Sequence, residues 1–438
     1  MIFPGRSIKT AREVTLLKPG RGVFLACLSL TLGLSCQRPP SEDAGRSARV
    51  IPRYTFEAAR EVLEKAVDQG EIPGAVGLVA VGGRVVFREA FGWRDSDDDV
   101  PMREDTIFRI ASMTKPITSL AVLMLHEEGR FQLDDPISLF IPEFEDPEIV
   151  VRSTNGQRAF ERVPAQGEIT IRHLLTHTSG IGYGFSGVQP LTRLYSEADV
   201  SDGLVQTEGT IGQGIRRLAK QPLLHEPGTA WKYGLSTDVL GRLVEIVSGK
   251  TLAEFFEEDI FVPLGMKDTH FFLPEEKEPR LASVYRLRSD GNLRELPAEP
   301  IEEGPVVFST SYHYRGPQTY FSGGAGLVST VDDYYRFCQM LLNGGELEGV
   351  RLLKPETVRE MTTNQIGELS VGDGKFGFGF SIQTRDTVSA FGGGGFFFTA
   401  LWIDPEPELI GIFMAQLWPN QRSRVDDDFR SAVDRAIR

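Results

Sequence analysis

The alternation of apolar and polar positions in the first half of the chain predicts a helix followed by a hairpin. Residues 55–69 repeat apolar side chains at helical spacing, which predicts an amphipathic helix. The next two apolar runs, 75–81 and 84–93, are separated by Gly82-Gly83, a pair typical of a tight turn between antiparallel strands. We therefore expect this helix to pack on the sheet that the hairpin begins.

The C-terminal part of the chain returns to strand-like patterns after a long interval. Three segments, 376–383, 400–403 and 409–416, have the apolar and aromatic character of strands. A final helix over 424–437 repeats apolar side chains on one face. Since strand patterns stand at both ends of the chain, we expect one sheet assembled from distant segments, with helices packed on it.

Between these ends, the pattern is mostly helical and is interrupted by loops rich in proline and glycine. We interpret residues 111–324 as a mostly helical insertion, and residues 51–110 and 325–438 as the α/β part of the same domain. The predicted fold class is therefore α/β (α+β), without a visible internal repeat. The helices predicted in and after the insertion cover 213–220, 237–247, 252–257 and 334–342.

The N-terminus has the pattern of an export signal. A basic segment precedes the apolar run 22–35, which is too short to span a bilayer but suits the core of a signal peptide. The run ends at Cys36, a pattern similar to a bacterial lipoprotein signal, and 37–50 reads as a polar linker. The sequence allows two outcomes: attachment of a lipid to Cys36, or ordinary cleavage of the leader followed by secretion. We therefore expect residues 1–36 to be a signal peptide, and the protein to be periplasmic, membrane-anchored or secreted.

Composition and net charge limit the classes of molecule that the protein is expected to bind. The chain has 438 residues, of which 41% are hydrophobic and 25% are charged, as is usual for a globular domain. Its net charge of −14 repels nucleic acid phosphates, so we expect no nucleic-acid partner. Besides Cys36, the chain after the leader contains only Cys338, which leaves no intramolecular disulfide framework. The sequence gives no indication of the oligomeric state.

Ser112 and Lys115 form the first candidate for chemistry. They stand three residues apart at the start of an amphipathic helical pattern, and Pro116 is tolerated only near a helix start. This spacing puts the ammonium on the same face as the hydroxyl, beside free backbone N–H groups and the positive end of the helix dipole. The pair suits a nucleophile with a proton-handling partner. The alternative is a serine N-cap followed by an exposed lysine.

Two further patterns could indicate functional sites, a pair of histidines and a tyrosine on a loop. His173 and His177 are four residues apart, as in zinc proteases, but Leu174 replaces the glutamate that such sites use as general base. We therefore expect no metal site and no cofactor. Tyr233 follows the Pro227-Gly228 turn on an irregular segment, from which it could reach a buried lysine. A nearby ammonium favours the phenolate, so Tyr233 could act as a general base, or it could be a structural tyrosine.

Five segments together resemble the serine β-lactamase and penicillin-binding-protein superfamily. They are most similar to its class C-like branch, which includes the family VIII carboxylesterases, and the resemblance extends from Phe56 to the C-terminus. It implies a β-lactamase/transpeptidase-like fold with an antiparallel sheet. The segments are SMTK (from Ser112), the loop of Tyr233, IRHLLTHTSG (171–180), SGGAGLVST (322–330) and FGGGGFFFTALWIDP (391–405).

The resemblance also implies roles for individual residues. Ser112 would be the acylated nucleophile, Lys115 its proton partner, and Tyr233 the group that takes the hydroxyl proton and passes it to the leaving group. The oxyanion hole would use the backbone N–H groups of Ser112 and Phe396. Phe396 follows the triplet Gly393-Gly394-Gly395, and the glycine run 392–395 also allows a register shifted by one residue.

Two departures from the family's pattern bear on substrate choice. Leu235 stands where β-lactamases have an asparagine, and Gly393 stands where they have a lysine. A lost charge-assisted hydrogen bond costs about 1.5 to 3 kcal/mol, which disfavours β-lactam hydrolysis. Leu235 and the triplet are thus the expected substrate-binding positions, and Phe396, Phe397 and Phe398 are either an apolar pocket or core.

We therefore expect an exported serine hydrolase that forms an acyl-enzyme on small carboxylic esters. A β-lactamase or a D-amino-acid peptidase, acting on an amide, is the alternative within enzymes. A non-catalytic binding or sensor protein that has kept the fold is the alternative outside them.

Overall fold

The computed structural model describes residues 54–153, 159–385, 388–420 and 423–437. The chain divides into two units, residues 1–50 and residues 51–438, and all the helices and strands described belong to the second. The predicted signal peptide 1–36, its Cys36 and the linker 37–50 lie outside the described residues. In the parts of the chain that are described, no helix is both long enough and apolar enough to cross a bilayer.

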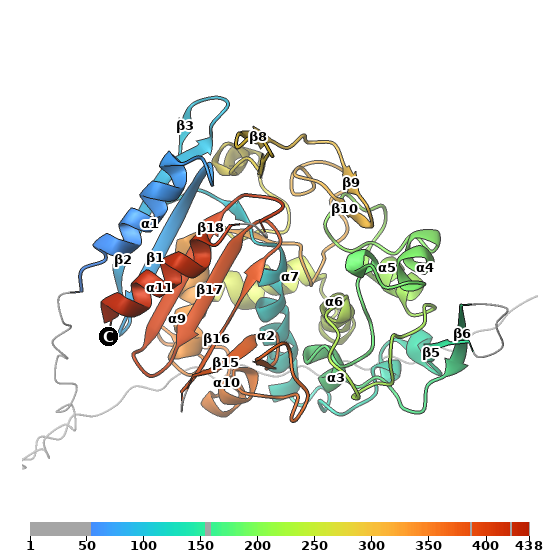
Figure 1. Ribbon diagram of the computed structural model, residues 1–438. Helices are drawn as coiled ribbons and strands as arrows, with labels where there is room; N and C mark the ends of the chain where they lie inside the picture. The colour runs from blue at the N-terminus through green and yellow to red at the C-terminus, as the bar shows by residue number, and fades with distance from the viewer. Residues whose placement is uncertain (1–53, 154–158, 386–387, 421–422, 438) are drawn as a thin grey trace, which may run out of the picture. The chain divides into compact units, whose positions relative to one another are not determined.

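An eight-stranded antiparallel sheet joins the two ends of the domain, as the sequence predicts (Figure 1). Strand β1 near the N-terminus pairs with β18 near the C-terminus, so that Leu78 lies opposite Ile412. The strand order is β14-β15-β16-β17-β18-β1-β2-β3. The strands are β1 (Gly74–Val81), β2 (Arg84–Asp95), β3 (Val100–Pro101), β14 (Lys375–Phe376), β15 (Ser381–Arg385), β16 (Val388–Gly395), β17 (Thr399–Asp404) and β18 (Leu409–Ala415).

The predicted strand over 376–383 is wrong in one respect, because the structure divides it into β14 and β15. Gly379 between them adopts a φ of 87°, a left-handed conformation that glycine tolerates and a strand excludes. A Cβ atom at Gly379 would lie 2.6 Å from Oγ of Ser119. The chain bends here because it passes close to a helix.

Helices cover both faces of the sheet. On one face, α1 (Glu57–Asp68) and α11 (Val425–Ile437) pack against each other and against the sheet around Phe429. On the other face lie α2 (Thr114–Glu127) and α9 (Val331–Leu342), as Figure 1 shows. Every residue of β1 is buried, since alternate side chains enter these two apolar layers.

Helix α2 differs from the amphipathic helix that its pattern predicts. Residues 114–123 are all buried, including Thr118 and Ser119. The reason is that α2 lies between the sheet and α6 (Ser236–Ser248), so no side of its first turns faces solvent. Burial of a polar group is compensated by an internal hydrogen bond at Thr118, whose hydroxyl donates to the carbonyl of Gly323 at 2.7 Å.

The remaining elements are short, and α3, α5 and α7 among them pack on α6. The predicted helices near 213, 237, 252 and 334 are confirmed as α5, α6, α7 and α9, and α9 begins earlier than predicted because Thr330 caps it. The other helices are α3 (Ile171–Leu175), α4 (Leu191–Glu197), α5 (Ile211–Leu218), α7 (Leu252–Phe256), α8 (Val262–Leu264) and α10 (Pro355–Met361). In the described parts of the chain, five two-stranded sheets complete the fold. Four are formed by strands consecutive in the chain: β5 (Glu148–Arg152) with β6 (Phe160–Pro164), β7 (Tyr285–Leu287) with β8 (Leu293–Glu295), β9 (Ile301–Glu303) with β10 (Val306–Phe308), and β12 (Glu346–Leu347) with β13 (Val350–Arg351). The fifth pairs two distant segments, β4 (Phe108–Arg109) and β11 (Val328–Ser329).

Candidate active site

Ser112 lies in a short 3-10 helix, η1 (Ala111–Met113), that leads directly into α2. This places its hydroxyl beside the N-terminal N–H groups of α2, as its spacing from Pro116 predicts. Ala111 has a φ of 39°, an unfavourable conformation for a residue with a Cβ atom, which costs on the order of 1 to 3 kcal/mol. Surrounding contacts hold the segment in place; the hydroxyl of Tyr334 donates to the carbonyl of Met113 at 2.7 Å.

Arg109 fixes the strand that precedes Ser112. Its buried guanidinium donates to the carbonyls of Thr310, at 2.7 Å, and Ala282, at 2.6 Å, and it also contacts the side chain of Gln416. Burial lowers the pKa of Arg109 to about 10. Three segments that are distant in the sequence are thereby tied to β4, immediately before the candidate nucleophile.

Lys115 is 1% exposed, and its ammonium group has three oxygen neighbours. Nζ lies 3.3 Å from Oγ of Ser112, 2.8 Å from the hydroxyl of Tyr183 and 2.8 Å from the carbonyl of Gly324. An ammonium has three protons to donate and no acceptor, so this environment matches its charged form. The alternative of an exposed lysine is therefore wrong.

Tyr233 faces the same ammonium with its ring. Nζ of Lys115 lies 4.6 Å from the ring centroid, and Tyr233 is half-buried on the loop that precedes α6. The ring also packs against His177, with centroids 4.7 Å apart, and against Trp231 at 5.9 Å. The structure thus brings Ser112, Lys115 and Tyr233 together, although they come from η1, α2 and a separate loop.

Tyr183 is a second tyrosine at this site, and the sequence analysis missed it. It is buried, its hydroxyl accepts from Lys115, and its ring stacks on Phe185 with centroids 4.5 Å apart. Burial raises the pKa of Tyr183 well above its ordinary value, because the phenolate would be poorly solvated. The only signal for it was an aromatic residue shortly after the segment 171–180, in the region that already carried the resemblance.

The two histidines of the segment 171–180 have different surroundings. His173 accepts a hydrogen bond from the N–H of Thr170 and takes part in capping α3. His177 is buried against the Tyr233 ring, and burial followed by the positive charge of Lys115 lowers its pKa well below the ordinary value. His177 is therefore neutral, and it supports one side of Tyr233.

The glycine-rich end of β16 lies next to the Ser112 segment. Strand β15 pairs with β16 only as far as Gly392, so Gly393, Gly394 and Gly395 have one edge without a β15 partner. A Cβ atom at Gly395 would lie 2.4 Å from the carbonyl oxygen of Ile110, two residues before Ser112. At Gly393, by contrast, a Cβ atom would have no other atom within 4 Å.

Of the three phenylalanines after this triplet, two are core residues. Phe397 and Phe398 are buried, whereas Phe396 is half-buried. Phe396 packs on Phe308 and Trp418, with centroids 5.4 and 5.6 Å away. Its backbone therefore follows the triplet directly, while its ring is partly accessible.

Leu235 does not present its side chain to a substrate. It is 1% exposed, belongs to the main apolar core and directly precedes α6. The resemblance predicts a substrate-binding position here, because asparagine occupies it in β-lactamases. The structure instead gives Leu235 a packing role beneath the loop of Tyr233.

A pair of glycine substitutions tests the close approach of β16 to the Ser112 segment. We expect Gly395→Ala to lower the free energy of unfolding by about 1 to 3 kcal/mol, because the methyl group collides with the Ile110 carbonyl. Gly393→Ala, the matched control, should change it by less than about 0.5 kcal/mol. Urea unfolding monitored by circular dichroism measures both. Equal stabilities would contradict the observed packing.

Comparisons with known proteins identify the family to which this fold belongs. The beta-lactamase family model matches residues 59–435. Esterase EstB of Burkholderia gladioli is 35% identical over 343 residues, which cover 76% of this chain and 80% of EstB. Among solved structures, EstCE1, described as a hydrolase with promiscuous acyltransferase activity, is 28% identical with a TM-score of 0.73, covering 86% of this chain and 97% of EstCE1. Simvastatin synthase LovD from Aspergillus terreus is 25% identical with a TM-score of 0.70, covering 86% of this chain and 96% of LovD.

Proposed function

Because the chain belongs to the beta-lactamase family and is a serine hydrolase of the esterase type, we propose that its substrates are small carboxylic esters with an apolar acyl or alcohol group. The observation that carries this proposal is the contact of one buried ammonium, that of Lys115, with Ser112 and two tyrosines, beside a strand end without charged side chains.

In the proposed reaction, Oγ of Ser112 attacks the ester carbonyl while Tyr233, as phenolate, takes its proton. The resulting oxyanion is held by the N–H groups of Ser112 and Phe396. Tyr233 then gives the proton to the departing alkoxide, and the ester C–O bond breaks. Water, deprotonated by Tyr233, attacks the acyl-enzyme, and the proton returns to Ser112 as the acid leaves.

Tyr233 and Tyr183 have different surroundings, and we assign them different roles for that reason. A phenolate next to an ammonium is electrostatically favoured, and Tyr233 meets Lys115 while remaining half-exposed. Tyr183 is buried, and the raised pKa of its hydroxyl keeps it neutral, so it serves as an acceptor that positions Lys115. We therefore assign the base role to Tyr233.

The preference for esters over β-lactams follows from Gly393. A β-lactam carries a carboxylate that needs a cationic or polar partner, whereas Gly393 offers only backbone and open space. Half-buried Phe185 and Phe396 pack on an apolar cluster that includes Ala111 and Ala325. These two alanines adjoin Ser112 and Gly324, so apolar surface lies close to the proposed nucleophile and suits an apolar group of the ester.

We also propose that the protein acts outside the cytoplasm, either anchored through a lipid on Cys36 or released after cleavage. This rests on the basic segment and apolar run before Cys36. Mass spectrometry of the mature N-terminus distinguishes a diacylglyceryl cysteine from a free terminus. An uncleaved leader would contradict the proposal.

A substrate panel tests the proposed function. We expect a p-nitrophenyl butyrate ester to be turned over at least about 100-fold faster than a chromogenic cephalosporin or a D-alanyl dipeptide, since only the latter two need a carboxylate partner. Intact mass after rapid mixing should show a transient acyl adduct on Ser112. Faster turnover of the cephalosporin or the dipeptide would favour the enzyme alternatives. A stable adduct without product would favour a binding or sensor protein.

A further inference from the structure

The loop from Ser322 to Gly326 connects Lys115 to a buried carboxylate that has no part in the proposed reaction steps. Lys115 donates to the carbonyl of Gly324 at 2.8 Å. The N–H of the same glycine donates to Oδ1 of Asp238, at 3.3 Å, and the hydroxyl of Ser322 donates to that oxygen at 2.6 Å. Gly324 therefore bridges the ammonium and the carboxylate through its own N–H and C=O groups.

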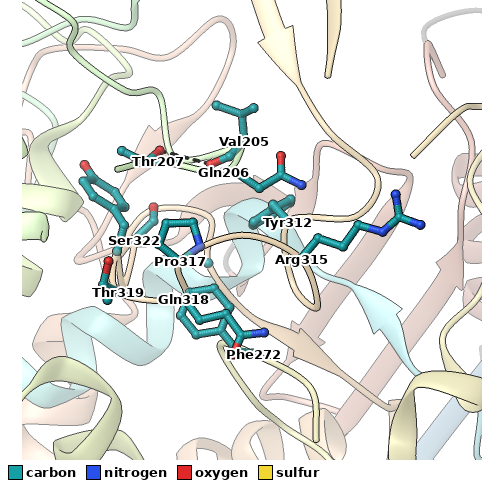
Figure 2. Close-up of a pocket in the computed structure, with 13 residues that line it drawn as sticks. Val205, Gln206, Thr207, Phe272, Tyr312, Arg315, Pro317, Gln318, Thr319 and Ser322 are labelled. Atoms are coloured by element: carbon teal, nitrogen blue, oxygen red, sulfur yellow. Dashed lines mark hydrogen bonds between the residues drawn. The ribbon is translucent and has the colours of Figure 1, made fainter. Parts of the chain in front are cut away.

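The same loop is also held from its other side. Figure 2 shows Ser322, Tyr312 and Pro317 among the residues that line a pocket beside this loop. The hydroxyl of Tyr312 donates to the carbonyl of Ala325 at 2.8 Å. Because Ser322, Gly324 and Ala325 each make a hydrogen bond to another segment, the Gly324 carbonyl has little freedom to move away from Lys115.

Asp238 is an unusual residue at its position. It is 0% exposed and is the third residue of α6, where the helix dipole favours a negative charge. Burial raises the pKa of Asp238, while the hydrogen bond from Ser322 and the positive charge of Lys115 act in the opposite direction. Its second oxygen, Oδ2, is buried and accepts no hydrogen bond from any residue in the described ranges. A buried carboxylate of this kind requires a compensating positive charge.

Lys115, from α2, is the cation that interacts with Asp238. The titratable groups around Asp238 on the neighbouring loops are Tyr183, Tyr320 and Asp202. Burial raises the pKa of both tyrosines, which keeps them neutral. Burial raises the pKa of Asp202 to about 7, and the charge of Asp238 contributes in the same direction.

The backbone of the bridge fits only glycine. A Cβ atom at Gly324 would lie 2.4 Å from Oδ2 of Asp238. At Gly323 it would lie 2.7 Å from the carbonyl oxygen of Thr237, the residue before Asp238. The loop and the start of α6 are therefore packed backbone against side chain, which brings the carboxylate as close to Gly324 as the chain permits.

We propose that Asp238 is a positioning residue: its charge, transmitted through Gly324, keeps Lys115 in the ammonium form and so leaves Tyr233 as the base for Ser112. The inference rests on the proposed function. Without the carboxylate, burial would favour a neutral amine at Lys115. A neutral amine would no longer stabilise the Tyr233 phenolate and would itself compete for the Ser112 proton.

The test is the pH dependence of two rates in the Asp238→Asn variant, which keeps the shape and removes the charge. One is kcat/KM for p-nitrophenyl butyrate, and the other is the rate at which a fluorophosphonate probe labels Ser112, read by intact mass. Both rates should fall at least about tenfold at the pH optimum. The alkaline limb of each pH–rate profile should move to lower pH by about one unit or more, as expected for the loss of a buried charge partner. Ser119→Ala, the control, removes a buried hydroxyl of α2 that faces Gly379, and it should leave the alkaline limb in place.

Gly324→Ala is a second variant, in which the added methyl group displaces the Asp238 carboxylate from its hydrogen bond to residue 324. The alkaline limb of its pH–rate profile should also move to lower pH. The inference is overturned if folded Asp238→Asn or Gly324→Ala protein, checked by thermal melting, keeps the wild-type limb while losing only amplitude. If wild-type Ser112 is not labelled and no ester is turned over, the proposed function fails instead. Labelling and turnover with an unmoved limb would leave the function intact and remove only the role of Asp238.

Discussion

Replacement of Ser112 by alanine is expected to lower kcat/KM for p-nitrophenyl butyrate by at least about 10⁴-fold, since no acyl-enzyme can form. The hydroxyl is half-buried and its removal leaves the strained η1 segment and the Lys115 contacts to Tyr183 and Gly324 in place. The melting temperature should therefore stay within a few degrees of wild type. Initial rates and thermal melts of the purified variant measure both quantities.

Ser119 provides a matched control for this substitution. It lies in the same helix and is also buried, but it faces Gly379 rather than the cluster around Lys115. Ser119→Ala should retain activity within about threefold, as expected for a small change away from the reacting groups. Comparable losses in the two variants, or an unchanged rate in Ser112→Ala, would remove Ser112 from the role of nucleophile.

The sheet was predictable because its strands carry their own signals. The buried run of β1 and the Gly82-Gly83 turn identify a hairpin without reference to the rest of the chain. Strand patterns at the C-terminus then require the distant pairing that β1 and β18 form. The Ser112–Lys115 pair was predictable for a similar reason, since three residues on one helical turn bring the two side chains together.

The residues missed by sequence analysis depend on contacts between distant segments. Tyr183 meets Lys115 across 68 positions, and the bridge from Asp238 to Gly324 spans 86. The periodicity of apolar residues within a helix or strand carries no information about contacts between such distant segments. Similarly, the burial of Leu235 and the complete enclosure of the first turns of α2 arise because other elements pack over them, and neither follows from helical periodicity.

The glycine triplet 393–395 combines one position that packing requires with one that it leaves open. Gly395 has to be glycine because the segment before Ser112 passes against it, whereas Gly393 has open space around it. A residue with a side chain at Gly393 would therefore be sterically tolerated. Under the proposed function, the absence of a side chain at Gly393 bears on substrate choice and not on folding.

The two tyrosines at Lys115 give the second large expected effect. Tyr233→Phe should lower kcat by about 10³-fold with little change in KM, because it removes the group that takes and returns the proton in the transition state. Tyr183→Phe should cost about 10- to 100-fold, the range expected for one lost charge-assisted hydrogen bond to Lys115. Each variant is the control for the other, since both remove one hydroxyl from a tyrosine whose ring lies close to the same ammonium, with Nζ of Lys115 4.6 Å from the ring centroid of Tyr233 and 5.4 Å from that of Tyr183.

Steady-state kinetics with separate kcat and KM values, and intact mass after rapid mixing, measure the difference. In Tyr233→Phe, acylation of Ser112 should itself be slow, so no adduct accumulates. If Tyr183→Phe were the more damaging substitution, the base role would pass to the buried tyrosine. That outcome would require Lys115 to stabilise a phenolate that burial disfavours. The half-exposed position of Tyr233, with its ring over the ammonium, makes the opposite order the expected one.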